Sequence, residues 1–173
     1  PKTRLRALVT DARAIEQTHL VLAFRCFGRH DPRRHVLRVL NVILGENMSS
    51  RLFQSLRERH GLAYSVASSL QLHADSGALL IGAALDPARE DKAAALCMAE
   101  LDRLRERPVR PAELARARDY VVGQLRLGLE TPESRMNWLG ETLTGYGAFI
   151  PPDETIAGCR AVTSEDLQAL ART

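Results

Sequence analysis

The chain has 173 residues, of which 45% are apolar and 26% are charged, and its formal net charge at pH 7 is +3. This composition excludes disordered, collagen-like and disulfide-scaffolded proteins, and it predicts a single globular domain over residues 1–173. The chain contains no apolar run of the ~20 residues needed to cross a bilayer, so we expect no membrane association. Because the chain starts at Pro1 without an initiator methionine, we expect the domain to be excised from a longer polypeptide. The residues do not identify its compartment, and the cytoplasm is the default expectation.

Basic side chains are concentrated in the first third of the chain. Residues 1–60 hold 12 basic and 5 acidic side chains, whereas residues 61–173 hold 12 and 16. A basic surface suits nucleic acid, a peptide or an acidic partner. Aromatic residues make up only 5% of the chain, and no nucleic-acid-binding motif is present. We therefore expect no nucleic-acid partner and interpret the basic region as a solvated face.

The chain is predicted to begin with a strand and a helix. Residues 18–27 are rich in β-branched and aromatic side chains, which is typical of a strand. Asp31 and Pro32 then supply a cap and a proline at the first helical position. Apolar residues follow at helical spacing as far as Gly45, which is predicted to end the helix.

A second helix and a hairpin are predicted next. The helix begins near Ser49 or Ser50, either of which could cap it, and ends at Gly61. After Gly61 the apolar period changes from 3.6 to 2, which predicts a strand over residues 63–72. A turn and a second strand over residues 77–85 complete an antiparallel hairpin.

The rest of the chain has helical patterns. One of these helices places four apolar residues on a face that we expect to be buried: Met136, Leu139, Leu143 and Tyr146. The predicted class is α+β, with a small antiparallel or mixed sheet of three to four strands and helices packed on one face. The helices are expected to begin at Asp86-Pro87, Pro111, Thr131-Pro132, Asp153 and Thr163, the last with a capping box.

No metal site or cofactor is predicted in this chain. Its five histidines belong to neither HExxH nor HxxEH, the helical spacings that place two imidazoles beside a carboxylate. Its three cysteines form no CxxC pair. His30, Asp31 and His35 could meet at a helix start, where capping and solvent exposure are favoured over metal binding.

One segment carries most of the functional information. It runs from Leu44 to Val66 and reads LGENMSSRLFQSLRERHGLAYSV. It closely resembles the second, non-zinc-binding half domain of the insulinase/pitrilysin family of zinc metallopeptidases, which includes mitochondrial-processing-peptidase-like proteins. The pattern in that family is similar to LGGGxSSRLFxxLREKxGLAYSV. Looser matches at residues 75–77, 111–118 and 162–167 extend the resemblance over most of the chain.

The resemblance implies that the chain is one half of an enzyme. Family members have two homologous halves, of which the first binds zinc through HxxEH. The second closes over the active site and contributes an arginine and, seven residues later, a tyrosine near the scissile carbonyl. These positions match Arg57 and Tyr64, for which the resemblance implies substrate binding. It implies no catalytic residue and no metal in this chain alone, and zinc in an HxxEH-bearing partner half, in cis or in trans.

The implied activity is that of a zinc-dependent endopeptidase acting on a peptide substrate, and the chain is expected to be inactive by itself. The alternative function is a non-catalytic scaffold or assembly module of the same fold. Either role leaves an apolar face uncovered when the half is isolated, so we also expect a homo-oligomer.

Residue chemistry leaves two interpretations of the pair open. Arg57 lies one helical turn beyond Phe53, so its guanidinium could reach a peptide carbonyl or instead bond the last carbonyls of its own helix. Tyr64 could donate a hydrogen bond to an oxyanion or be a core residue of its strand. Glu46 and Asn47 replace two glycines of the family pattern, which stiffens that loop and adds a charge. Other polar and aromatic residues are expected to be structural, namely Ser49, Ser50, Arg51 and Trp138.

Overall fold

The computed structural model describes residues 16–173, so the first fifteen residues of the predicted domain lie outside the described range. The described residues form a three-stranded sheet in the order β1-β3-β2, with both pairings antiparallel. Each strand ends within one residue of its predicted bounds, and the antiparallel alternative is the one that forms. The strands are β1 (Thr18–Cys26), β2 (Ala63–Leu72) and β3 (Gly77–Leu85).

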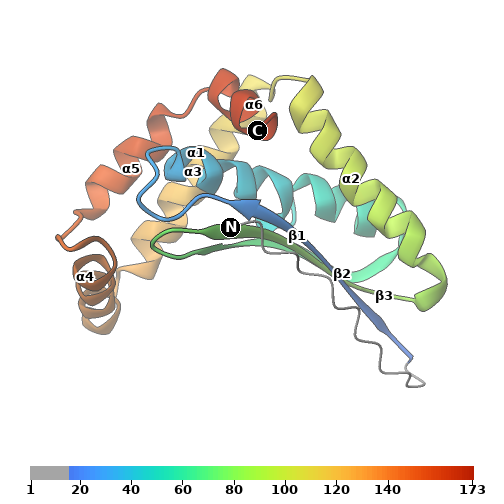
Figure 1. Cartoon of the computed structure of the whole chain (residues 1–173), viewed down its shortest axis with the longest axis horizontal. Helices are drawn as coiled ribbons and strands as arrows, with labels where there is room; N and C mark the ends of the chain where they lie inside the picture. The colour runs from blue at the N-terminus through green and yellow to red at the C-terminus, as the bar shows by residue number, and fades with distance from the viewer. Residues whose placement is uncertain (1–15) are drawn as a thin grey trace, which may run out of the picture.

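The helices form a layer on one face of the sheet, with α4 at one end of the molecule (Figure 1). This arrangement confirms the predicted α+β class. None of the described helices is long and apolar enough to span a membrane. In chain order the helices are α1 (Arg34–Asn41), the π-helical η1 (Val42–Glu46), the π-helical η2 (Phe53–Arg59), the 3-10 helix η3 (Pro87–Arg89), α2 (Glu90–Glu106), α3 (Pro111–Gly128), α4 (Pro132–Tyr146), α5 (Pro152–Ala161) and α6 (Ser164–Ala171).

Side-chain caps begin several of these helices where the sequence predicts them. Thr131 Oγ1 accepts a hydrogen bond from the Ser134 amide at 3.1 Å at the start of α4. Thr163 and Asp166 form the predicted capping box of α6. Each of these caps satisfies an amide that has no partner within its helix. The predicted cap of α1 is different: Asp31 Oδ1 accepts the Arg33 amide at 2.8 Å, but the helix begins at Arg34, so Asp31 and Pro32 lie in the turn before it and do not cap it.

The predicted serine cap of the second helix is wrong. Ser50 is buried, and its Oγ has no hydrogen-bond partner among the described residues. In the loop before the helix, Asn47 Oδ1 accepts a hydrogen bond from the Ser49 amide at 2.8 Å. The chain therefore enters this helix through an Asx turn, and the helix begins at Arg51, directly after the two serines, as the predicted start near Ser49 or Ser50 requires.

The core lies between the sheet and the helix layer. The Leu44–Val66 segment contributes three leucines that are fully buried, Leu44, Leu52 and Leu56. Burial of each leucine stabilises the fold by roughly 1.5–3 kcal/mol, which holds η1 and η2 against β2. Gly45 lies so close to β2 that a methyl group in its place would be 2.6 Å from the Ser68 amide nitrogen.

The prediction that the apolar residues of α4 are buried is wrong for three of the four. Met136 is 64% exposed, Leu139 43% and Leu143 47%, whereas Tyr146 is half-buried. The helix turns a different face, with the buried Thr142, toward the domain. The α4 stripe, which we define as Met136, Leu139 and Leu143, therefore has no partner within residues 16–173.

Candidate functional site

The two residues matched to substrate binding lie on either side of a tight turn at Gly61. Gly61 has φ of 57°, a left-handed conformation that glycine adopts without strain. Its amide donates a hydrogen bond to the Arg57 carbonyl at 3.1 Å, and the Leu62 amide donates to the Leu56 carbonyl at 2.8 Å. These bonds end η2 and direct the chain into β2, as the glycine predicts.

A distant arginine also holds this turn. Arg89 Nη1 donates a hydrogen bond to the Gly61 carbonyl at 2.6 Å. Arg89 belongs to η3, which follows β3 and is itself held by the Asp86 side chain, an acceptor of the Ala88 amide at 2.9 Å. No local pattern predicts this contact, because 28 residues separate Arg89 from Gly61.

Arg57 is exposed near the end of η2. Its guanidinium carbon lies 5.2 Å from the centre of the Phe53 ring, a cation–π geometry that orients the side chain along the helix surface. Its side chain donates no hydrogen bond to any described residue, so the alternative that it bonds the helix carbonyls is not observed. Its donors remain directed to solvent.

Tyr64 lies in a β-bulge at the start of β2. Ala63 pairs with Leu85 and Ser65 with Ala84, so Tyr64 is the extra residue of its strand. The period of 2 predicted for residues 63–72 would place Tyr64 and Val66 on one face of the strand, but the bulge breaks this alternation. Tyr64 is 65% exposed, whereas Val66 is buried. This exposure contradicts the alternative that Tyr64 is a core residue, and its phenol has no partner among the described residues.

Glu46, which stands where the family pattern has a glycine, links two helices through its side chain. The Glu46 carboxylate accepts two hydrogen bonds from Arg38, at 2.9 and 2.8 Å, and one from Asn41 Nδ2 at 2.7 Å. Bidentate pairing with arginine fixes the geometry as well as neutralising the charge. Glu46 thereby ties the end of η1 to α1, and this structural role explains the stiffening that the sequence predicts.

The histidines and acidic residues do not converge. Among residues 16–173, no group of three or more His, Cys, Asp or Glu side chains is placed to hold a metal ion. Asp31 accepts hydrogen bonds from the Arg33 side chain, and His30 packs edge-on against Tyr146 with 5.5 Å between ring centres. His35 faces Cys159, with 3.9 Å between Nδ1 and Sγ.

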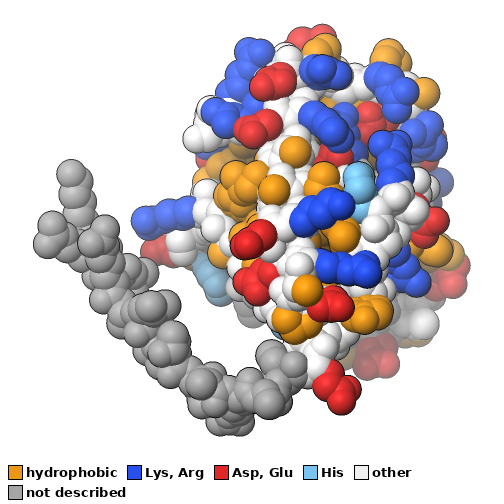
Figure 2. Space-filling model, turned by 90° about the vertical axis from the view of Figure 1, so that its right-hand side faces the viewer, with side chains coloured by type: hydrophobic (Ala, Val, Ile, Leu, Met, Phe, Trp, Pro, Cys, Tyr) orange, Lys and Arg blue, Asp and Glu red, His pale blue; other side chains and the backbone are white. Residues whose placement is uncertain are grey.

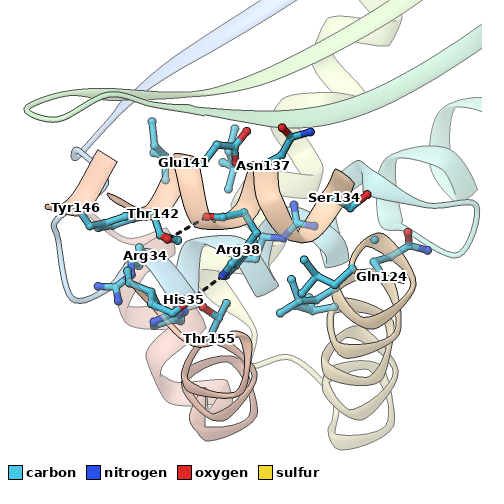
Figure 3. Close-up of a pocket in the computed structure, with 18 residues that line it drawn as sticks. Arg34, His35, Arg38, Gln124, Ser134, Asn137, Glu141, Thr142, Tyr146 and Thr155 are labelled. Carbon is cyan, nitrogen blue, oxygen red and sulfur yellow. Dashed lines mark hydrogen bonds between the residues drawn. The ribbon is translucent and has the colours of Figure 1, made fainter. Parts of the chain in front are cut away.

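A cavity of about 640 Å³ lies between α1, α3, α4, α5 and the end of β2. Figure 3 shows Arg34, His35 and Arg38 of α1 gathered beneath α4. Burial lowers the pKa of His35, and the nearby Arg34 charge lowers it further. Trp138 lines the cavity and donates a hydrogen bond from Nε1 to the Ile150 carbonyl at 2.8 Å, which ties α4 to the segment that follows it. The lining holds no nucleophile bonded to a base.

Comparison with known proteins places this geometry in a family. Residues 1–121 match the peptidase M16 inactive domain. The chain belongs to the M16 peptidase family, as its inactive domain. It is 41% identical over 161 residues to a zinc protease of Mycobacterium tuberculosis, a match that covers 93% of this chain and 37% of the relative. It is 38% identical over 160 residues to a zinc protease of Streptomyces coelicolor, covering 92% of this chain and 35% of that protein.

Solved structures of this family share the fold. A peptidase M16 inactive domain from Pseudomonas fluorescens has a TM-score of 0.81 at 21% identity and covers 90% of this chain and 37% of that one. An inactive peptidase domain from Bordetella parapertussis has a TM-score of 0.78 at 24% identity and covers 95% of this chain and 89% of that one. This chain thus spans little more than a third of the length of its curated relatives.

Proposed function

We propose that this M16 inactive domain closes over the active site of an HxxEH-bearing half and completes a zinc-dependent endopeptidase. The family match and the zinc-protease names of the relatives support this role. The described residues of this chain offer no metal site, so zinc would belong to the other half. The chain alone would then be inactive toward peptides.

Arg57 and Tyr64 would bind the substrate. The observation that carries this assignment is that both side chains are exposed and have no hydrogen-bond partner within residues 16–173, while three hydrogen bonds to backbone carbonyls hold the Gly61 turn between them. The fold therefore does not depend on hydrogen bonds from Arg57 or Tyr64, yet the rigid Gly61 turn fixes the backbone that carries both side chains before any substrate binds. The guanidinium can orient a peptide carbonyl or a carboxylate, and the phenol can donate a hydrogen bond to a developing oxyanion.

The α4 stripe would be one contact surface for the missing half. It consists of three apolar residues on successive turns of one helix, and each is at least 43% exposed. Exposed apolar surfaces of this kind mark sites of association. The relatives are more than twice as long as this chain, so a polypeptide of their length contains a further part that could pack on the α4 stripe.

The test is steady-state kinetics of the complete zinc-loaded protein that carries this domain and an HxxEH half. Tyr64→Phe removes only the hydroxyl, and Arg57→Ala removes the donor fork. We expect each to lower kcat by roughly 10- to 1,000-fold, the scale of losing one oxyanion donor. Tyr120→Phe and Arg126→Ala are the matched controls, because neither side chain forms a hydrogen bond to a described residue and neither residue lies at the Gly61 turn.

Both variants should keep the unfolding midpoint of the wild type to within a few degrees, because neither side chain forms a hydrogen bond within residues 16–173 and the exposed contact of Arg57 with Phe53 is worth only about 0.5–1 kcal/mol. Unchanged kcat/KM in both variants would show that Arg57 and Tyr64 do not contribute to catalysis. It would favour the non-catalytic scaffold instead.

A further inference from the structure

A second groove lies between the loop and helix at residues 47–59, the end of α2 and the start of α3. Its volume is about 590 Å³, within the range of small-ligand sites. Its lining is dominated by six arginines and includes two glutamates, an excess of four positive charges. The arginines are Arg51, Arg59, Arg103, Arg107, Arg110 and Arg116.

Both carboxylates of the groove are already engaged. Glu113 accepts two hydrogen bonds from Arg51, at 2.8 and 3.0 Å, in a pair that is less than one-fifth exposed. Glu100 is buried and bonds Arg103. The charge-assisted hydrogen bonds of these two arginine–glutamate pairs hold the side chains in place and so fix the walls of the groove.

Four guanidinium groups remain for a ligand. The side chains of Arg59, Arg107, Arg110 and Arg116 are exposed, and none forms a hydrogen bond or ion pair with a described residue. They come from three different elements, and the fold brings them to one concave surface. On the side of the molecule that carries α2, Lys and Arg side chains are numerous, with Asp and Glu side chains between them (Figure 2).

The start of α3 adds to the positive potential. This helix has 18 residues, and its N-cap residue, Arg110, provides no side-chain acceptor. The first turn of α3 also contains the Glu113 carboxylate, but Arg51 pairs with that charge, so the positive end of the helix dipole still adds to the potential of the groove. The pKa of Glu113 gives the same indication: burial raises it, but the Arg51 hydrogen bond and the charges of Arg51, Arg110 and Arg116 lower it on balance.

We propose that this groove binds a small oligophosphate, a compact ligand with several phosphate groups. The arginine fork matches phosphate oxygens, and phosphate groups concentrate more charge in a given volume than carboxylates do. The lining includes no aromatic residue that could stack on a base, so the site recognises the phosphates rather than a nucleobase. This site is independent of the proposed peptidase role.

The test is isothermal titration of the 173-residue chain with sodium tripolyphosphate at low ionic strength. We expect saturable binding with one site per chain, and weaker binding as salt is added. The double variant Arg107→Gln/Arg110→Gln should bind at least about tenfold more weakly, because each arginine loses charge-assisted hydrogen bonds. Arg126→Gln is the matched control, an exposed arginine on α3 outside the groove, and its affinity should stay within about twofold of the wild type.

Thermal melts separate this result from misfolding, since neither substituted side chain bonds the fold. The proposal is overturned if no saturable binding occurs, or if Arg126→Gln weakens binding as much as the double variant does. It is also overturned if tricarballylate binds as tightly as tripolyphosphate, because the groove then does not select phosphate. Tighter binding of an oligoglutamate peptide would identify the groove as a docking surface for an acidic polypeptide.

Discussion

Gly45 offers a sharp test of how the Leu44–Val66 segment is built. Gly45 is buried in η1, and a methyl group there would lie 2.6 Å from the Ser68 amide nitrogen and 2.9 Å from Ser68 Cβ. Ser68 itself is 4% exposed, pairs with Ile81 of β3 and donates a hydrogen bond to the Asn41 carbonyl at 3.2 Å. The strand therefore has little room to retreat.

The magnitude follows from two opposing contributions. Replacing a helical glycine by alanine favours the helix by about 1 kcal/mol. Overpacking of a dense interior costs about 1–3 kcal/mol. The difference is a net loss of about 0–2 kcal/mol. Because the contact is made with backbone as well as side chain, we expect Gly45→Ala to lower the free energy of unfolding by the upper half of this range, about 1–2 kcal/mol.

Gly123→Ala is the matched control. Gly123 lies within α3, and a methyl group there would meet nothing within 4 Å. This substitution should raise the free energy of unfolding by about 0.5–1 kcal/mol. The assay is urea unfolding of both variants followed by far-UV circular dichroism, with equal m-values as the condition for comparison. A Gly45→Ala variant as stable as the wild type would refute the close approach of η1 to β2.

Two further predictions concern an ion pair and a surface. The pKa of Glu113 is held below its ordinary value of 4.5, so its pair with Arg51 stabilises the fold above that pH and ceases to do so as the pH falls through the folded-state pKa. Glu113→Gln should therefore lower the free energy of unfolding by about 1.5–3 kcal/mol at pH 7 and by much less well below pH 4.5, and a difference independent of pH would contradict this. The isolated chain should self-associate in sedimentation equilibrium, and Leu139→Ser/Leu143→Ser should reduce that association while Leu127→Ser, equally apolar and exposed on α3, should not. A strictly monomeric wild type at high concentration would contradict the proposed role of the α4 stripe.

The sequence predicts the strands and the helix order well because their signals are local. The bounds of β2 follow from an alternation of period 2, and the end of η2 follows from Gly61. The bulge at Tyr64 is different, since one extra residue disturbs the period only once and leaves no repeated signal. The sequence therefore identifies the residue but not its exposure.

The parts of the candidate site that the sequence misses depend on contacts between distant residues. Arg89 bonds Gly61 across 28 positions, and Arg51 bonds Glu113 across 62. The helical spacing of the apolar residues identifies the α4 stripe, but this spacing is the same for a face that is buried in its own domain and for a face that binds another chain. That distinction needs the packed structure.

The most direct test of the proposed function is reconstitution from two separately produced parts, the HxxEH-bearing half and the 173-residue chain. The account predicts that neither part alone hydrolyses peptide, and that mixing them restores metal-dependent cleavage. A chain carrying Tyr64→Phe should bind the other half with unchanged affinity but restore a kcat roughly 10- to 1,000-fold lower. Full activity of the HxxEH half without this chain would contradict the central claim.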